Sequence, residues 1–369
     1  MDNAYLQIDL NQLHHNIEAI LNYREYRCPI IAVLKTNAYG CGMVEISREL
    51  DSHRDICMIA VSHLSEALTL RQGGVKKPVL VLTYTKPELA YLAVENDIVL
   101  TVVSSAHAQA LDALCLPLRV HVKVDTGLHR YGIENLEELR DVYQLQHLRF
   151  EGIFTHFASA ESYDASEIAF TYQQKEHFDQ AIAYLESQWV DVGMTHTQNT
   201  PSFFHYPEFE YDAVRMGMAL LGVAHPSQYD IMAKAGIKPI FSGHTLVSKI
   251  ETVKAHESVG YLRSYTAQSD EIIAIIACGY SELLPRNMYQ KEGFCIINGK
   301  PYPYIANDAM SASFVRVDHS VHVNDPVILF DETVLPFYQF LSFFSLGTNE
   351  YTTYLNPDLE RIYCRLDQG

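Results

Sequence analysis

The sequence of 369 residues has no apolar run long enough to cross a membrane, and it is poor in basic residues. No stretch approaches the roughly 20 apolar residues that a transmembrane helix needs, so we expect no membrane-spanning segment. The 27 Lys and Arg stand against 45 Asp and Glu, which gives a formal net charge of -18. A surface of this charge repels phosphate backbones and anionic lipids, and therefore argues against binding to nucleic acids or to a membrane surface.

Paired cysteines and metal-binding motifs are also lacking. The seven cysteines include no CxxC pair and are odd in number, which favours reduced thiols in a cytosolic protein over a disulfide framework. The 17 histidines include no HExxH motif and no Cys/His cluster, so we expect no catalytic metal. The N-terminus has acidic residues early and no basic segment before an apolar run, so we expect no signal peptide and a cytoplasmic protein.

The first two-thirds of the chain alternates between short apolar runs and amphipathic segments of helical periodicity. Such alternation predicts a parallel sheet with crossover helices, and about eight such units predict a TIM-type (β/α)8 barrel. An open doubly wound sheet is the alternative, although no GxGxxG motif follows an early strand. The expected barrel strands lie at 5–10, 29–35, 56–62, 78–84, 97–104, 119–125, 149–157 and 194–200.

The pattern changes after residue 238, where apolar runs follow one another without long helices between them. The dipeptide Asn298-Gly299 between two such runs predicts a β-hairpin, because both turn positions need positive φ. We therefore predict two domains, an α/β barrel over 1–238 and a smaller, mainly β domain over 239–369. The expected strands of the second domain lie at 244–255, 271–280, 293–306, 313–318 and 325–330.

The most informative segment is IIAVLKTNAYGCG, residues 30–42. Lys35 ends an apolar run, which would place it at the C-terminal mouth of a barrel, where the active sites of such folds lie. Burial lowers the pKa of a lysine amine, and the neutral amine can form a Schiff base with a carbonyl compound. An isolated lysine at a strand end more often only reaches into solvent. The sequence Asn-Ala-Tyr-Gly that follows favours a functional site.

With this segment the chain resembles the alanine racemase family, and within it the racemase domain of the vancomycin-resistance serine/alanine racemases. The resemblance covers almost the whole chain in the family's order. It implies a barrel and a β domain, pyridoxal phosphate on Lys35, a homodimer with shared active sites, and racemisation of alanine for peptidoglycan. The other matching segments are 120–132, 150–157, 197–200, 212–222 and 278–286.

The resemblance also implies a set of cofactor contacts. Tyr39 and Thr200 would bind the phosphate, and Arg215 would face the pyridine nitrogen. Because a guanidinium only donates hydrogen bonds, Arg215 would keep that nitrogen unprotonated, which disfavours transamination. His196 would be a supporting residue. The complete set of implied cofactor-binding residues is Lys35, Tyr39, His156, Asn199, Thr200, Arg215, Gly217 and Met218.

Racemisation requires two groups that flank Cα, one on each face. The resemblance implies that Lys35 acts on the D-enantiomer, and that Tyr280 from the partner subunit acts on the L-enantiomer. A phenol is a weak base near neutral pH unless its neighbours stabilise the anion, and His156 is the implied neighbour.

Substrate contacts are implied at Arg130, Met310 and Ser311, with Arg130 holding the substrate carboxylate. Lys123 matches a lysine that is often carbamylated in the family. Without this modification, Lys123 and Arg130 would bring two cations together, which is unfavourable.

Three segments depart from the family pattern. Ser311 replaces the usual Asp, Glu282-Leu283 replaces Asp-Gly, and Pro357 stands where a phosphate-binding tyrosine is expected. We therefore expect an intact catalytic centre with an altered pocket edge.

Four alternatives remain. The first is a racemase of serine or another small amino acid. The second is a barrel-type decarboxylase, but its glycine-rich phosphate segment and Cys-Asp pair are missing. The third is a small pyridoxal-phosphate homeostasis protein, which lacks the β domain. The fourth is an inactive relative that binds the cofactor or an amino acid. Lys35, Arg215 and Tyr280 argue against this last reading, whereas Ser311 and Pro357 favour it.

Overall fold

The computed structural model describes residues 3–24, 27–286, 288–344 and 346–366. The chain folds into two compact units. The barrel unit comprises residues 16–220 and 224–237, and the β unit comprises 1–15, 221–223 and 238–369. The domain division at residue 238 stays a prediction. Within the described ranges, no helix combines the length and apolar character that a membrane span requires.

The barrel unit contains eight parallel strands in the order β8-β7-β6-β5-β4-β3-β2-β9. The backbone N–H of Ala213 donates to the carbonyl of Thr195 at 3.3 Å and links the two ends of this sheet. The nearly closed barrel confirms the predicted fold class. The strands are β2 (Ile30–Val33), β3 (Ile56–Val61), β4 (Val79–Val81), β5 (Ile98–Val102), β6 (Leu118–Lys123), β7 (Leu148–Phe154), β8 (Met194–His196) and β9 (Val214–Met216).

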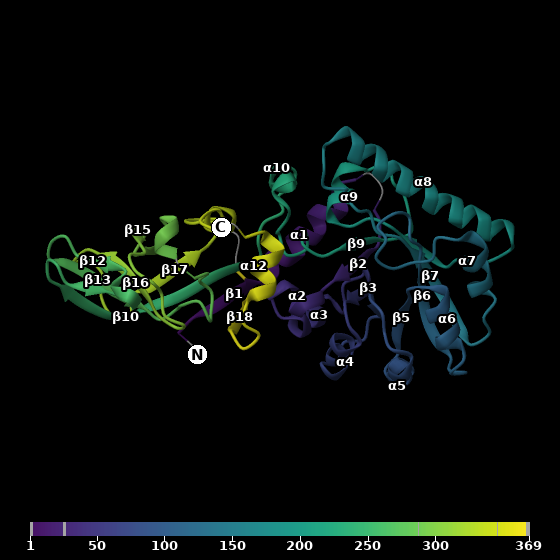
Figure 1. The fold of residues 1–369 in the computed structure, drawn as a ribbon, viewed down its shortest axis with the longest axis horizontal. Helices are drawn as coiled ribbons and strands as arrows, with labels where there is room; N and C mark the ends of the chain where they lie inside the picture. Colours follow the sequence, from purple (N-terminus) through teal and green to yellow (C-terminus); the bar gives the residue numbers. More distant parts are fainter. Residues whose placement is uncertain (1–2, 25–26, 287, 345, 367–369) are drawn as a thin grey trace. The chain divides into compact units, whose positions relative to one another are not determined.

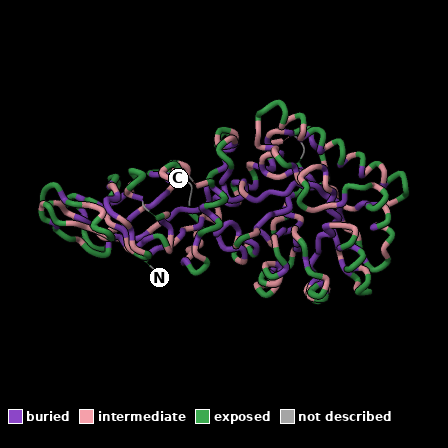
Figure 2. The backbone as a smooth tube through the Cα atoms, viewed as in Figure 1, coloured by how far each residue is buried: buried purple, intermediate pink, exposed green. Residues whose placement is uncertain are grey.

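Helices surround these strands. Figure 1 shows α4 to α7 outside the barrel strands, and Figure 2 shows that the strands are buried while the outer faces of the helices are exposed. The helices are α1 (Leu10–Asn22), which has residues of both units, α2 (Lys35–Tyr39), α3 (Met43–Leu50), α4 (Leu64–Gln72), α5 (Ala90–Glu95), α6 (Ser105–Asp112), α7 (Leu136–Tyr143), α8 (Ala165–Ser187), α9 (Thr200–His205) and α10 (Tyr229–Lys234), with 3-10 turns η1 (Pro87–Leu89) and η2 (Pro226–Gln228).

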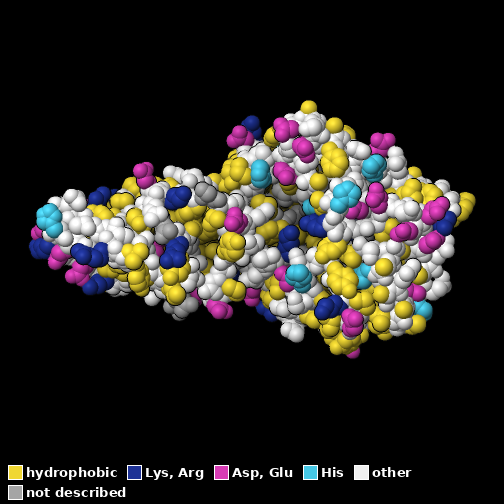
Figure 3. Space-filling model, in the orientation of Figure 1, with side chains coloured by type: hydrophobic (Ala, Val, Ile, Leu, Met, Phe, Trp, Pro, Cys, Tyr) yellow, Lys and Arg dark blue, Asp and Glu magenta, His cyan; other side chains and the backbone are white. Residues whose placement is uncertain are grey.

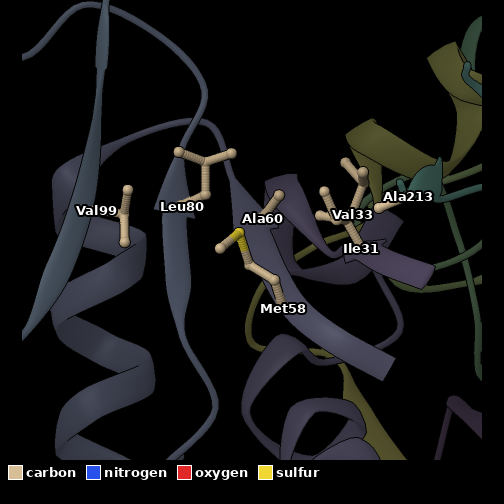
Figure 4. Packing of buried hydrophobic residues seen from close by; sticks show 7 residues of the cluster. All are labelled: Ile31, Val33, Met58, Ala60, Leu80, Val99 and Ala213. Carbon is tan, nitrogen blue, oxygen red and sulfur yellow. The ribbon is translucent and has the colours of Figure 1, made fainter. Parts of the chain in front are cut away.

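The interior of the barrel is apolar on one side and polar on the other. Residues two apart on a strand share a face, so β2 to β5 contribute alternate apolar side chains to one cluster (Figure 4). The polar side is formed by buried residues of β6, β8 and β9, namely His121, Lys123, His196 and Arg215. Because buried polar groups need partners, this side is where a functional network is expected. The apolar cluster consists of Ile31, Val33, Met58, Ala60, Leu80, Val99 and Ala213.

One predicted barrel strand belongs elsewhere. β1 (Tyr5–Asp9) pairs antiparallel with β10 (Phe241–Val253) and parallel with β18 (Glu360–Cys364), so its assignment to the barrel was wrong. The eighth barrel strand is β9, which we had not predicted as a strand. The burial of β1 alternates between buried and intermediate residues, whereas β2 and β5 are buried throughout. Alternation is typical of a sheet covered on one face, and a barrel strand is covered on both.

The β unit is built on an eight-stranded sheet in which β1, β13 and β17 all pair with β10. Asn298 and Gly299 have φ values of 50° and 76° and connect β14 to β15, which confirms the predicted hairpin. The remaining elements are β11 (Ser258–Val259), η3 (Tyr261–Arg263), β12 (Tyr265–Thr266), β13 (Glu271–Ile276), η4 (Met288–Lys291), β14 (Phe294–Ile297), β15 (Lys300–Pro303), β16 (Ser313–Val317), β17 (Pro326–Phe330), α11 (Phe337–Ser342) and α12 (Thr348–Tyr354).

Candidate active site

Lys35 is the second residue after β2 and directly precedes a left-handed turn. The four residues that follow it, Thr36 to Tyr39, have φ values between 51° and 53°. Left-handed backbone ordinarily costs about 1–2 kcal/mol for each non-glycine residue, so the turn needs strong local support. Backbone hydrogen bonds within the turn supply part of this support. The side chain of Asn37 supplies more, because it accepts a hydrogen bond from the N–H of Met43 at 2.9 Å. The segment after Lys35 is therefore held in one unusual conformation.

Glu66 provides further support for this turn. Its carboxylate accepts hydrogen bonds from the backbone N–H groups of Thr36 at 2.6 Å, Ser62 at 2.8 Å and His63 at 3.1 Å. Glu66 is the third residue of α4 and takes part in a capping box with His63. Glu66 was not singled out from the sequence, although an acidic residue near the start of an amphipathic segment was the available signal. Glu66 ties the lysine turn to the start of α4.

The environment of Lys35 favours a reactive amine. Burial lowers the pKa of Lys35, and the positive charges of Arg130 and Arg215 lower it further, while Glu66 acts in the opposite direction. A lowered pKa increases the share of neutral amine near pH 7, and the neutral amine is the nucleophile.

Tyr39 and Gly217 lie against one another. A Cβ atom on Gly217 would lie 2.7 Å from the hydroxyl oxygen of Tyr39, so only glycine leaves this approach open. Thr200, at the start of α9, accepts a hydrogen bond from the N–H of Ala219 at 3.4 Å. Burial raises the pKa of Tyr39, which keeps its hydroxyl protonated. The structure thus brings Tyr39 and Thr200 to the segment that contains Gly217 and Met218.

Arg215 is buried and makes five hydrogen bonds. Its Nη2 donates to the carbonyl oxygens of Thr155 at 2.8 Å and Thr197 at 2.7 Å, and lies 3.2 Å from Nδ1 of His156. Its Nη1 donates to the carbonyl oxygen of His196 at 2.8 Å and lies 2.9 Å from Nδ1 of the same residue. For the Nε–H of Arg215, the described residues offer no partner. The guanidinium is therefore fixed in the barrel, and its Nε–H is available to donate to a ligand.

This arginine determines the proton positions of two histidines. Because a guanidinium can only donate, Nδ1 of His196 must accept, and its Nε2 carries the proton. Nε2 of His196 lies 2.8 Å from Nδ1 of His121, which must accept in turn. Burial and the nearby arginine charges lower the pKa of His196 well below its usual value and that of His121 to about 3. In the hydrogen-bond chain from Arg215 through His196 to His121, each residue therefore donates a proton to the next. His121 was not singled out from the sequence.

Four basic side chains lower the pKa of neighbouring groups at this end of the barrel, namely Lys35, Lys123, Arg130 and Arg215. Burial, Arg130 and Arg215 lower the pKa of Lys123 to about 8. Burial, Arg215, Arg130, Lys123 and Lys35 lower the pKa of His156. The outer surface, in contrast, displays many acidic side chains (Figure 3). This concentration of positive charge suits a ligand that carries phosphate and carboxylate groups.

Asn199 has a structural partner of its own. It is the N-cap of α9 and accepts from the N–H of Ser202 at 3.1 Å, while Ser202 Oγ accepts from the Asn199 N–H at 2.8 Å. The capping box accounts for Asn199, and a cofactor contact at this residue stays a prediction.

In the β unit, the segment that carries Tyr280 is bound to the segment before β16. The N–H groups of Tyr280 and Ser281 donate to the carbonyl oxygens of Ala309 at 3.3 Å and Met310 at 2.9 Å. The guanidinium of Arg286 lies 5.5 Å from the centre of the Tyr280 ring, within reach of a cation–π interaction. Tyr280 and Arg286 both line a hollow of about 630 Å³. Arg286 is thus a positive neighbour of Tyr280, and it was not named from the sequence.

The three departures from the family pattern also lie in the β unit. The hydroxyl of Ser311 donates to Glu282 at 2.6 Å, so two of the departures are in direct contact. The side chain of Asn356, next to Pro357, donates to the carbonyl oxygen of Ser281 at 3.1 Å. The pocket edge expected to be altered is therefore one connected set of residues.

One further group could in principle bind a metal. Glu18, His53 and Asp55 place ligand atoms within 4.8 Å of one another. The guanidinium of Arg27, however, donates to Asp55 at 2.9 Å and to Glu18 at 3.5 Å. We interpret this group as an ion-pair cluster.

Two family descriptions match the chain over nearly its full length. The alanine racemase N-terminal domain matches residues 8–225, and the alanine racemase C-terminal domain matches residues 240–363. The chain belongs to the alanine racemase family.

Individual members of the family show the extent of the similarity. An alanine racemase of Desulfosudis oleivorans is 30% identical over 383 aligned residues, with 98% of this chain and 96% of the relative covered. A serine/alanine racemase of Enterococcus gallinarum is 28% identical over 86% of this chain, which spans only 45% of that relative. The chain thus has about half the length of some curated relatives that it matches. An alanine racemase structure from Clostridium difficile has a TM-score of 0.90 at 27% identity, covering 99% of this chain and 96% of the other.

Proposed function

We propose that this chain is a pyridoxal-phosphate-dependent racemase of small amino acids, with alanine as the first substrate to test and serine as the second. The observation that carries the proposal is the environment of Lys35 at the carboxyl end of the barrel strands. Its amine is partly buried, its pKa is lowered by Arg130 and Arg215, and a strained turn fixes its position. Such an amine is suited to covalent attachment of an aldehyde cofactor.

The surrounding residues fit pyridoxal phosphate. The hydroxyl groups of Tyr39 and Thr200, with the backbone of Gly217 and Met218, form a cradle for a phosphate, and a Cβ atom at Gly217 would fill it. The Nε–H of Arg215 is a donor for the pyridine nitrogen. Since this arginine is fixed by five hydrogen bonds, it would donate to that nitrogen without giving up its proton.

In the proposed reaction, bound pyridoxal phosphate withdraws electrons from the substrate and makes its Cα hydrogen acidic. Lys35 holds the cofactor and moves a proton at Cα on one face. Tyr280 moves a proton on the other face. Arg130 binds the substrate carboxylate, and Lys123 orients Arg130 after carbamylation. His156 and Arg286 are the neighbours that stabilise the tyrosine anion.

We further propose that Tyr280 acts in the active site of a second copy of this chain. The β unit exposes several large apolar side chains near Tyr280, including Tyr261 at 66%, Leu262 at 94% and Met310 at 64% exposure. Large exposed apolar side chains that gather on one surface are typical of interaction sites. A homodimer would cover them and would complete each active site with Tyr280 and Met310 from the partner.

The cofactor is tested first. Protein supplied with pyridoxal phosphate is treated with borohydride, digested, and its labelled peptide is identified by mass spectrometry. The label is expected on Lys35, and Lys35→Ala should remove it. A label on another lysine would reject the assignment.

The activity is tested with purified protein, pyridoxal phosphate and a panel of L-amino acids, with chiral chromatography as the readout. D-alanine or D-serine is expected. In a bacterial strain that requires external D-alanine, the gene should restore growth if the enzyme supplies cytoplasmic D-alanine for peptidoglycan. A protein that binds the cofactor and racemises nothing in the panel would be the inactive relative.

The shared site is tested with two inactive variants. Lys35→Ala and Tyr280→Phe chains are mixed under conditions that permit subunit exchange. Each mixed dimer contains one site with both intact residues, so activity should return. Failure to recover activity after proven exchange would contradict a shared site.

A further inference from the structure

Glu282 lies at the centre of a hydrogen-bond cluster beside Tyr280. One oxygen of its carboxylate accepts from the backbone N–H of Gly279 at 2.8 Å. The other accepts from the hydroxyl groups of Ser281 at 2.7 Å and Ser311 at 2.6 Å. These partners come from two segments, since Ser311 lies 29 residues after Glu282. The carboxylate therefore joins the Tyr280 segment to the segment before β16.

The cluster fixes the direction in which the hydroxyl of Ser311 points. An ionised carboxylate only accepts hydrogen bonds, so the 2.6 Å contact with Glu282 is made by the single proton of Ser311, whose oxygen also lies 3.2 Å from the hydroxyl of Ser281. What remains on the exposed Ser311 oxygen is lone-pair capacity, which accepts hydrogen bonds. Hydrogen bonds to a charged group are strong and polarise their donor, so the Ser311 oxygen becomes a better acceptor than an isolated hydroxyl.

This acceptor lies close to the residue that we propose as a base. The N–H of Tyr280 bonds to the carbonyl of Ala309, and that of Ser281 bonds to the carbonyl of Met310, which directly precedes Ser311. A Cβ atom on Gly279 would lie 2.2 Å from the carbonyl oxygen of Ala309, so the two segments are in close contact. If Tyr280 acts at Cα of the substrate, then Ser311 is within the same small region as the groups attached to Cα.

We propose that Glu282 and Ser311 form a specificity-determining pair that accepts a hydrogen bond from a hydroxyl group on the substrate side chain, and so admits serine beside alanine. This inference rests on the proposed racemase function. It assigns a role to Glu282, which presents Ser311 as an acceptor without placing a full charge next to the substrate carboxylate. A carboxylate at position 311 itself would place that charge there, with the repulsion that two like charges produce.

The test compares kcat/KM for L-serine and L-alanine in four variants. Ser311→Ala removes the acceptor. Glu282→Gln reverses the direction of the hydrogen bond between residues 282 and 311. The amide oxygen must face the Gly279 N–H, so the amide N–H groups donate to the Ser311 oxygen and occupy its acceptor capacity. Both variants should lower the serine-to-alanine ratio about tenfold, the effect of one hydrogen bond of about 1.4 kcal/mol. Ser311→Thr keeps the hydroxyl and should retain most of the ratio.

The matched control is Ser320→Ala, which removes an exposed serine hydroxyl that donates to Asp318 in the same unit. Its serine-to-alanine ratio should equal that of the unchanged protein. Thermal unfolding without substrate gives an independent readout. If Glu282 and Ser311 interact, the loss of stability in the double variant Glu282→Gln/Ser311→Ala should be smaller than the sum of the two single losses.

The outcomes separate the inference from the function on which it rests. An active enzyme whose ratio is unchanged in Ser311→Ala and Glu282→Gln would overturn the inference alone. Strictly additive losses of stability would also overturn it. If the unchanged protein racemises neither alanine nor serine, the proposed function fails, and the specificity role fails with it.

Discussion

The guanidinium of Arg215 contacts His196 at two atoms of that residue. Its Nη1 donates to the carbonyl oxygen at 2.8 Å and to ring Nδ1 at 2.9 Å. The contact with the carbonyl positions the arginine, and the contact with the ring fixes the histidine tautomer. The backbone of the barrel thus positions the Arg215 guanidinium, and the hydrogen bond to the His196 ring also determines the proton position of the bond from His196 to His121.

Replacement of Arg215 by Lys should be costly although the charge is retained. A single ammonium has three protons at one point and cannot reach Thr155, His196 and Thr197 together. Each buried carbonyl left without a donor costs about 1–3 kcal/mol. We expect a fall in melting temperature and weaker binding of pyridoxal phosphate, measured by thermal unfolding and cofactor titration. Arg140→Lys is the control, since among the described residues the Arg140 side chain bonds only to the exposed Asp141. Equal effects in both variants would contradict the role of Arg215.

Gly152→Ala should disturb the far end of the histidine chain. A Cβ atom on Gly152 would lie 2.6 Å from Cε1 of His121 and 2.7 Å from the carbonyl oxygen of Met194. Overpacking of a buried site costs about 1–3 kcal/mol, which urea unfolding should detect. Gly347→Ala is the matched control, because a methyl group there meets nothing within 4 Å. A stable Gly152→Ala variant would mean that His121 moves aside freely.

Lys123 should make stability depend on pH at alkaline values. Burial, Arg130 and Arg215 lower its pKa to about 8, whereas an unfolded chain holds lysine near 10.4. Between these values the unfolded chain binds more protons, so the free energy of unfolding should rise with pH, by up to about 3 kcal/mol. Lys123→Met should remove this rise and stabilise the protein most below pH 8. Urea titrations in buffer free of carbon dioxide measure the effect. Parallel pH profiles of the two proteins would contradict it.

The same lowered pKa favours carbamylation of Lys123, because only the neutral amine reacts with carbon dioxide. With labelled bicarbonate, carbon NMR should show a carbamate signal in the unchanged protein and none in Lys123→Met. Lys254→Met tests specificity, as Lys254 is an exposed lysine that pairs with Asp270. A signal that survives Lys123→Met would assign the carbamate elsewhere.

Tyr280→Phe should separate the two faces of the reaction. The variant keeps the ring and loses the group that exchanges a proton. Exchange of the Cα hydrogen with deuterated solvent should therefore fail from the L-enantiomer and persist from the D-enantiomer. The loss of one well-placed base typically lowers the rate by a factor of about 10²–10⁴. Phe replacement of Tyr354, which is 74% exposed, is the control. An equal loss of Cα-hydrogen exchange from both enantiomers would contradict the assignment of Tyr280 to the L-enantiomer.

The sequence by itself determined the barrel, the hairpin at Asn298-Gly299 and the family. These depend on local properties: apolar runs buried on both faces, two residues that tolerate positive φ, and ordered motifs around Lys35 and Tyr280. Lys35 and Arg215 could be named because they lie in such motifs.

Only the tertiary structure decided which distant groups meet. β1 has a strand sequence, but its pairing with β10 depends on residues more than 200 positions away. The link from Arg215 through His196 to His121, the support of the Lys35 turn by Glu66, and the contact between Glu282 and Ser311 all join separate elements. A hydrogen bond depends on separations of a few tenths of an ångström between such elements. Residue type and local pattern specify which groups need partners, and the packing of the chain selects them.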